Sequence, residues 1–137
     1  MSVTINQIYN TIVTAITQNR QLYCSSKLEP VSAADHFPAC QIVEVNHPNV
    51  QAALPLNFQT KANVTVRRDF EAHVFSNLKN GALSQAREIM DDVEVAFRTI
   101  GFIETACIQS DNADPSVIHL VARFTRNLCD GDSLTIE

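Results

Sequence analysis

Apolar residues recur at three- and four-residue steps near the start of the chain, which is the spacing of one face of an amphipathic helix. Thr4 and Gln7 have the Thr-x-x-Gln spacing of a capping box, so we expect the helix to begin there. Its other face is polar but uncharged, and on it Asn10 and Thr14 are candidate contacts with a partner; an ordinary solvated face is the alternative. The apolar stripe is Ile5, Ile8, Tyr9, Ile12, Val13 and Ile16.

Alternating apolar and polar residues over 63–75 predict a strand, because successive side chains of a strand point to opposite faces. Arg68 stands on the apolar parity, which suggests a bulge or a strand break near Arg67 and Arg68. Residues 39–45 are rich in β-formers and predict a second strand.

A helical pattern returns over residues 83–99, and Gly101 stands where a C-terminal cap belongs. We expect its acidic residues to form a solvated face, with metal binding as the weaker alternative. Those residues are Glu88, Asp91, Asp92 and Glu94.

Two further strands are predicted over 102–109 and 117–128, joined by a short polar turn. The order helix, strands, helix, strands, with hairpin-length connections, predicts an α+β fold. We expect one domain over residues 1–137, with a mixed, mostly antiparallel sheet and both helices packed on one face.

Two segments, 25–38 and 46–60, are predicted to be loops. The second is long, lacks Asp, Glu, Lys and Arg, and contains several apolar residues, so it favours ordering against another surface. That surface is either a partner or the chain's own sheet. The candidate contact residues of this loop are Val50, Leu54, Leu56 and Phe58.

The composition excludes several classes of protein. The formal charge is −5 without a basic run, which argues against sequence-specific binding of nucleic acid. No apolar run approaches the ~20 residues of a membrane span, and the first residues lack the pattern of a secretion signal. The four cysteines are far apart in the sequence, so we expect reduced thiols rather than disulfides or zinc ligands.

No motif of a catalytic site is present, and we predict no catalytic residue, no cofactor and no metal. A thiol enzyme would need a cysteine beside a histidine, and the pairs to consider are Cys40 with His36, or Cys107 with His73 or His119. Both His73 and His119 fall on the polar parity of their strands, so solvated histidines are the simpler expectation.

Five segments, taken in order, resemble the tail completion or tail terminator proteins of long-tailed bacteriophages, which are often labelled minor capsid proteins. They cover most of the chain between Phe37 and Phe124, and the first helix is also in its usual place. The segments are residues 37–45, which begin Phe-Pro-Ala-Cys, 70–77, which begin Phe-Glu-Ala-His, 86–92, 97–102 and 121–124.

This resemblance implies a structural protein without catalytic residues. Such proteins form a ring, typically of six subunits, that caps the head-proximal end of the tail tube, ends tube polymerisation and gives the head its docking surface. The expected partners are further copies of the chain, the tail tube protein and the head–tail connector proteins. The expected place is the tail of the virion, after synthesis in the host's bacterial cytoplasm.

Two alternatives stay open. A head-closure or adaptor protein on the head side of the joint would have a similar size and fold. A cytosolic small-ligand-binding or enzyme accessory domain belongs to another class, and a deep pocket with convergent polar groups would favour it.

Overall fold

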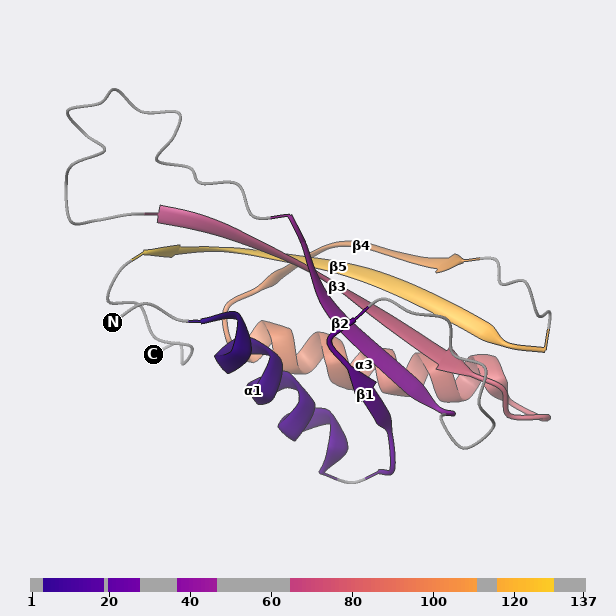
Figure 1. The fold of residues 1–137 in the computed structure, drawn as a ribbon. Helices are drawn as coiled ribbons and strands as arrows, with labels where there is room; N and C mark the ends of the chain where they lie inside the picture. Colours follow the sequence, from indigo (N-terminus) through magenta and orange to yellow (C-terminus); the bar gives the residue numbers. More distant parts are fainter. Residues whose placement is uncertain (1–3, 19, 28–36, 47–64, 111–115, 130–137) are drawn as a thin grey trace, which may run out of the picture.

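A computed structural model describes residues 4–18, 20–27, 37–46, 65–110 and 116–129 (Figure 1). The five strands form one sheet in the order β1-β2-β3-β5-β4, in which β1 is parallel to β2 and every other pair is antiparallel. The elements are α1 (Ile5–Thr17), β1 (Tyr23–Ser25), β2 (Ala39–Asn46), β3 (Thr65–Ser76), α3 (Ala82–Thr99), β4 (Ile103–Ser110) and β5 (Ile118–Cys129).

The α+β fold class and the mixed, mostly antiparallel sheet are confirmed. Both predicted helices and the four longer strands form within a few residues of the expected bounds. The short strand β1 was not predicted, because three residues are too few to show a period.

The start of α1 follows the expected capping box. The backbone N–H of Gln7 donates to Thr4 Oγ1 at 3.1 Å, and the backbone N–H of Thr4 donates to Gln7 Oε1 at 2.8 Å. Two otherwise unpaired donors of the first helical turn are thereby satisfied. Three isoleucines of the apolar stripe, Ile8, Ile12 and Ile16, are buried.

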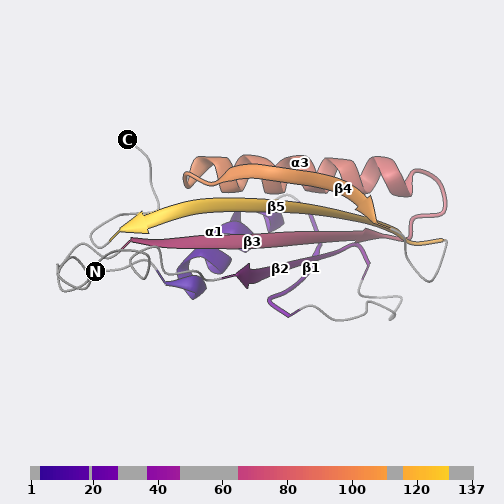
Figure 2. The same ribbon diagram turned by 90° about the horizontal axis from the view of Figure 1, so that it is seen from above.

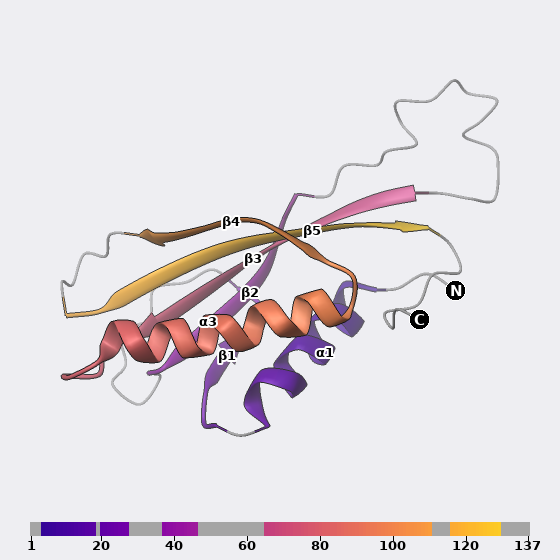
Figure 3. The same cartoon turned by 180° about the vertical axis from the view of Figure 1, so that it is seen from behind.

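The core forms where α3 meets the sheet. The ring of Phe97 on α3 stacks on Phe124 of β5 with centroids 4.3 Å apart, and it also contacts Phe70 of β3. The helix α3 contacts β3, β4 and β5, while α1 packs against α3 (Figure 3). Residues of both helices belong to one buried cluster with the sheet. The placement of both helices on one sheet face stays a prediction.

The expected bulge at Arg67 and Arg68 is wrong. β3 pairs with β5 in an unbroken register from Thr65 to Ser76. Arg68 can lie among the apolar positions of β3 because its guanidinium forms an ion pair with Glu44 of β2 at 3.0 Å. The register shifts lie in other strands, between Glu44 and Asn46 of β2 and between Glu104 and Ala106 of β4.

The end of α3 is a Schellman turn that leads directly into β4. Gly101 has φ of 88°, its N–H donates to Arg98 O at 3.0 Å, and the N–H of Phe102 donates to Phe97 O at 2.9 Å. The rings of Phe97 and Phe102 meet edge to face, 5.2 Å apart. Arg126 of β5 donates to the Ile100 carbonyl at 2.5 Å, so the sheet also satisfies the helix end.

We predict that Gly101→Ala destabilises the fold by about 1–2 kcal/mol for the left-handed backbone, and further for the contact of its methyl group. A Cβ at this position would lie 3.1 Å from Arg126 Nε, so the guanidinium that donates to the Ile100 carbonyl would have to shift by a few tenths of an ångström. Urea unfolding monitored by circular dichroism gives the change in free energy.

Gly81→Ala is the matched control for this substitution. Gly81 has φ of 91°, but a Cβ there meets nothing within 4 Å, so only the backbone cost applies. Equal destabilisation by the two substitutions would show that Arg126 accommodates the methyl group at residue 101 without cost.

Candidate functional site

The two candidate residues of α1 that the structure describes, Asn10 and Thr14, are both exposed on its polar face. Beside this face a hollow of about 250 Å³ lies between parts of α1 and α3, which contact each other elsewhere, with Thr11 and Ala15 on one wall and Val95 and Thr99 on the other. The other candidates, Val50, Leu54, Leu56 and Phe58, lie outside the described residues.

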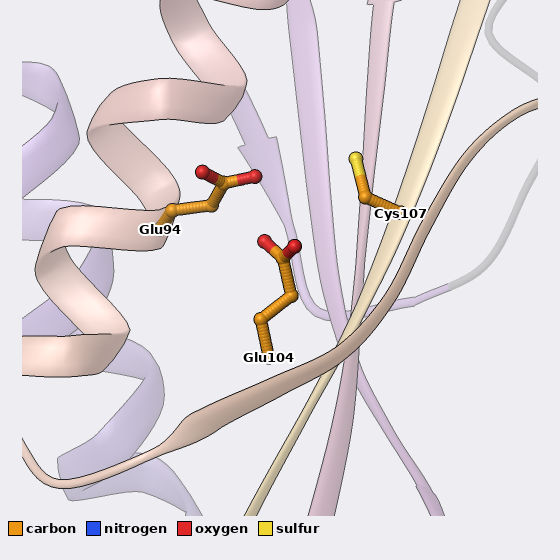
Figure 4. A group of neighbouring side chains, drawn as sticks. All are labelled: Glu94, Glu104 and Cys107. Atoms are coloured by element: carbon orange, nitrogen blue, oxygen red, sulfur yellow. The ribbon is translucent and has the colours of Figure 1, made fainter.

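A cluster of three polar side chains lies between α3 and β4 (Figure 4). Glu94 extends from the helix toward the strand, where Glu104 and Cys107 lie on the side that faces it. One carboxylate oxygen of each Glu and the Cys107 sulfur all lie within 4.8 Å of one another. The register shift after Glu104 makes this possible, since it puts Glu104 and Cys107 opposite Phe124 and Ala122 of β5, which both face the core.

The surroundings of this cluster favour the protonated forms of the Glu94 carboxyl group and the Cys107 thiol. Partial burial, a hydrogen bond with Glu104 and the charge of Asp91 together raise the pKa of Glu94 to about 7, while Arg98 opposes the rise. Burial and the neighbouring carboxylates also raise the pKa of the Cys107 thiol. A thiol held in its neutral form is a poor nucleophile, because the thiolate is the reactive species.

The same three groups have the ligand atoms that a divalent cation could use. Glu104 and Cys107 are exposed, and no other observation points to an ion there. Of the acidic residues of α3, Asp92 forms an ion pair with Arg20, and Glu94 alone belongs to the cluster.

A second polar cluster lies on the sheet face turned away from the core cluster. Glu71 and His73 of β3 lie beside His119 and Arg123 of β5. His73 Nε2 lies 3.0 Å from Glu71 Oε1, and His73 Nδ1 lies 2.8 Å from His119 Nε2. Arg123 donates to the other oxygen of Glu71. The expectation of a solvated histidine is wrong for His73, which is 6% exposed.

The direction of the hydrogen bonds to Glu71 follows from the charge of its carboxylate. Burial opposes ionisation of Glu71, but the bonds from Arg123 and His73 outweigh it and hold the pKa of Glu71 below its ordinary value. The ionised carboxylate only accepts, so His73 donates from Nε2 to Glu71 Oε1. The direction of the bond between His73 Nδ1 and His119 Nε2 is set by the tautomers of the two rings.

His119 is held in its neutral form by its surroundings. Partial burial and the neighbouring His73 lower the pKa of His119 to about 4. Its ring stacks on Phe75 with centroids 4.2 Å apart. The cluster thus ties β3 to β5 through hydrogen bonds between side chains.

The described thiols have no hydrogen bond to a histidine. The Cys107 sulfur lies within 4.8 Å of the Glu94 and Glu104 carboxylates, whereas His73 and His119 lie on the other sheet face. Burial raises the pKa of Cys24 to about 11, and burial also raises the pKa of Cys40. His36, the other expected partner of a thiol, lies outside the described residues. The prediction that the chain is not an enzyme stays a prediction.

No protein-family model matches the chain, and no curated protein matches its sequence. Neither of the described helices is long and apolar enough to cross a membrane.

We predict that Glu94→Gln makes the protein more stable than the wild type at pH 8. A carboxyl group whose pKa is higher in the folded chain contributes stability at low pH, and it loses this contribution as the pH rises from about 4.5 to about 7. The amide of Gln cannot ionise and can still donate to Glu104. Unfolding free energies measured from pH 4.5 to 8 should therefore fall less steeply for the variant.

Glu88→Gln removes the same charge from the exposed surface of α3, outside the cluster, and is the control. If both variants followed the same pH profile, the carboxyl pair would have no special effect on stability.

We predict that the contribution of His119 to the free energy of unfolding decreases in acid. The pKa of His119 is lower in the folded chain, so its contribution is present above about pH 6.5 and is lost as the pH falls toward about 4. The stability difference between wild type and His119→Gln should shrink over this range. Proton NMR of the ring should give a midpoint near pH 4; a midpoint near 6.5 would show that burial and His73 do not hold the ring neutral.

Proposed function

We propose that this chain is a structural subunit that assembles with copies of itself into a ring on the head-proximal end of a phage tail tube. There it ends tube polymerisation and gives the head its docking surface. The observation that carries this proposal is a pair of large apolar side chains exposed on the edge strand β4. Ile103 is 68% exposed and Ile108 is 62% exposed.

Exposed apolar groups on an edge strand favour assembly over a solitary domain. A free strand edge offers unpaired backbone groups to another chain, and soluble proteins usually protect it with charges or prolines. Among the residues of β4, Glu104 is the one charged side chain. Large exposed apolar groups beside such an edge are typical of a contact surface.

The arrangement of the family-like segments supports the same proposal. The five segments that resemble the family lie in or next to the strands and the helix that build the core, and they are not confined to surface loops. Residues 37–45 lead into and form β2, 70–77 include the end of β3, and 86–92 lie in α3. Residues 97–102 form the Schellman turn, and 121–124 lie in the middle of β5.

The exposed face of α1 is the second surface that fits a contact. Its polar residues carry no charge, and interface centres are depleted of charged groups. In the proposed ring this face contacts the tube or a neighbouring subunit.

The experiment that tests the function is electron microscopy of particles made by the parent phage with this gene disabled. The proposal expects tails of uncontrolled length beside unattached filled heads. Tails of normal length beside heads that fail to join would move the protein to the head side, as a head-closure or adaptor protein. Intact infectious virions would contradict both assembly functions and favour the ligand-binding or accessory domain.

We predict that Asn10→Glu with Thr14→Glu fails to restore joined particles when it is supplied to the disabled phage. Both side chains are exposed on α1, so the added charges should leave folding nearly unchanged while they repel a low-charge contact. Asn77→Glu, an exposed change in the turn after β3, is the control and should restore joining. Normal tails with the α1 variant would exclude this face from the contact.

A further inference from the structure

The sheet has two edges of different character. β4 lies at one edge and β1 at the other, with three strands between them (Figure 2). β1 runs parallel to β2, and each later neighbour in the sheet is antiparallel, so β1 and β4 run in opposite directions. If a second copy lies beside the first in the same orientation, its β1 is therefore antiparallel to the first copy's β4.

The β4 edge offers a short straight segment for such pairing. Seven of its eight residues are exposed. The register shift next to Thr105 bends the strand, and the regular part that follows is residues 106–110. Ile108 lies in this part and faces away from the core, since it is opposite Val121 of β5.

The β1 edge offers a hollow on the same side. A depression of about 500 Å³ lies beside β1. Tyr23, Phe37 and Pro38 line one part of it, and the end of α1 with the segment after it, residues 17 and 20–22, lines the rest. Phe37 packs on Ala39 and Phe75, which belong to the sheet face turned away from the core cluster. An apolar side chain that projects from that face of a neighbouring β4 can therefore enter this hollow.

The charges of the two edges are complementary. Glu104 is the one charged side chain of β4, and it lies beside Glu94 of α3. Lys27 is exposed just after β1, while Arg20, which lines the hollow, already forms an ion pair with Asp92. A contact between two β4 edges would bring like charges together, whereas a contact between β4 and β1 brings opposite charges together.

We propose that β4 of one subunit pairs antiparallel with β1 of a second copy of this chain, with Ile108 inserted into the hollow beside Tyr23 and Phe37. This contact joins two different patches, so repetition leads to a ring when the rotation closes. The inference rests on the proposed function, for which it names the surfaces that contact each other.

Such a contact is weak for an isolated pair of subunits. β1 has three residues, so the added pairing forms few backbone hydrogen bonds. The ring then closes where subunits are already held next to one another on the end of the tube, because tethering raises the effective concentration.

The test is zero-length carbodiimide cross-linking of the full chain, with equal amounts of unlabelled and nitrogen-15-labelled protein mixed at high concentration. This reagent joins a lysine to a carboxylate that it contacts, and peptides with one labelled and one unlabelled partner report links between subunits. We expect mixed links between Lys27 and Glu104, Glu94 or Asp91. The absence of these mixed links, with or without links elsewhere, would overturn the proposal.

Ile108→Lys should lower the yield of these mixed links about tenfold, because a buried apolar side chain contributes about 1.5–3 kcal/mol to a contact. Val95→Lys is the matched control, since Val95 is also exposed but lies on α3 beside the α1 hollow. Unfolding curves of both variants show that each is folded. Equal yields from Ile108→Lys and the wild type would overturn the role of the hollow.

The contact and the proposed function can fail separately. If the mixed links form but the disabled phage has normal tails, the contact stands and the tail function is wrong. If the disabled phage lacks finished tails but Ile108→Lys restores them fully, the tail function stands and this contact is wrong.

Discussion

The packing of Phe97 is the interaction on which the rest of the structure depends. Its ring joins α3 to β5 through Phe124 and to β3 through Phe70. Its backbone carbonyl accepts the N–H of Phe102 and so closes the turn at Gly101. Because β4 begins directly after that turn, the same residue that anchors the core also determines where the edge strand starts.

The elements that could be predicted from the sequence are those whose signal is local. The two helices have periodic apolar stripes with a capping box or a glycine at an end, and the long strands alternate. The errors have non-local causes. Arg68 suggested a bulge because its partner, Glu44, is 24 residues away in the sequence and comes close only in the folded sheet. β1 exists because β2 is there to pair with it.

The two polar clusters could not be predicted for a related reason. In an unbroken strand, residues 104 and 107 point to opposite faces, so nothing in the sequence brings Glu104 and Cys107 together. The register shift between Glu104 and Ala106 turns both side chains toward α3, where Glu94 lies. His73 and His119 both stand at polar positions of their strands. Their hydrogen bonds with each other and with Glu71 depend on the register of β3 and β5, which only the folded sheet determines.

A sheet whose edges differ has a direction along which copies can add. An edge that pairs with its own kind gives a closed dimer, whereas two unlike edges give a ring or a filament. The bulge of β4 and the shortness of β1 both limit the length of strand that can pair, so they keep such a contact weak. In the proposed tail terminator, weak association between subunits would limit ring formation to the end of the tube. Subunits that associated strongly in solution would form rings away from the tube, whereas weakly associating subunits form a ring only where the finished tube holds them together.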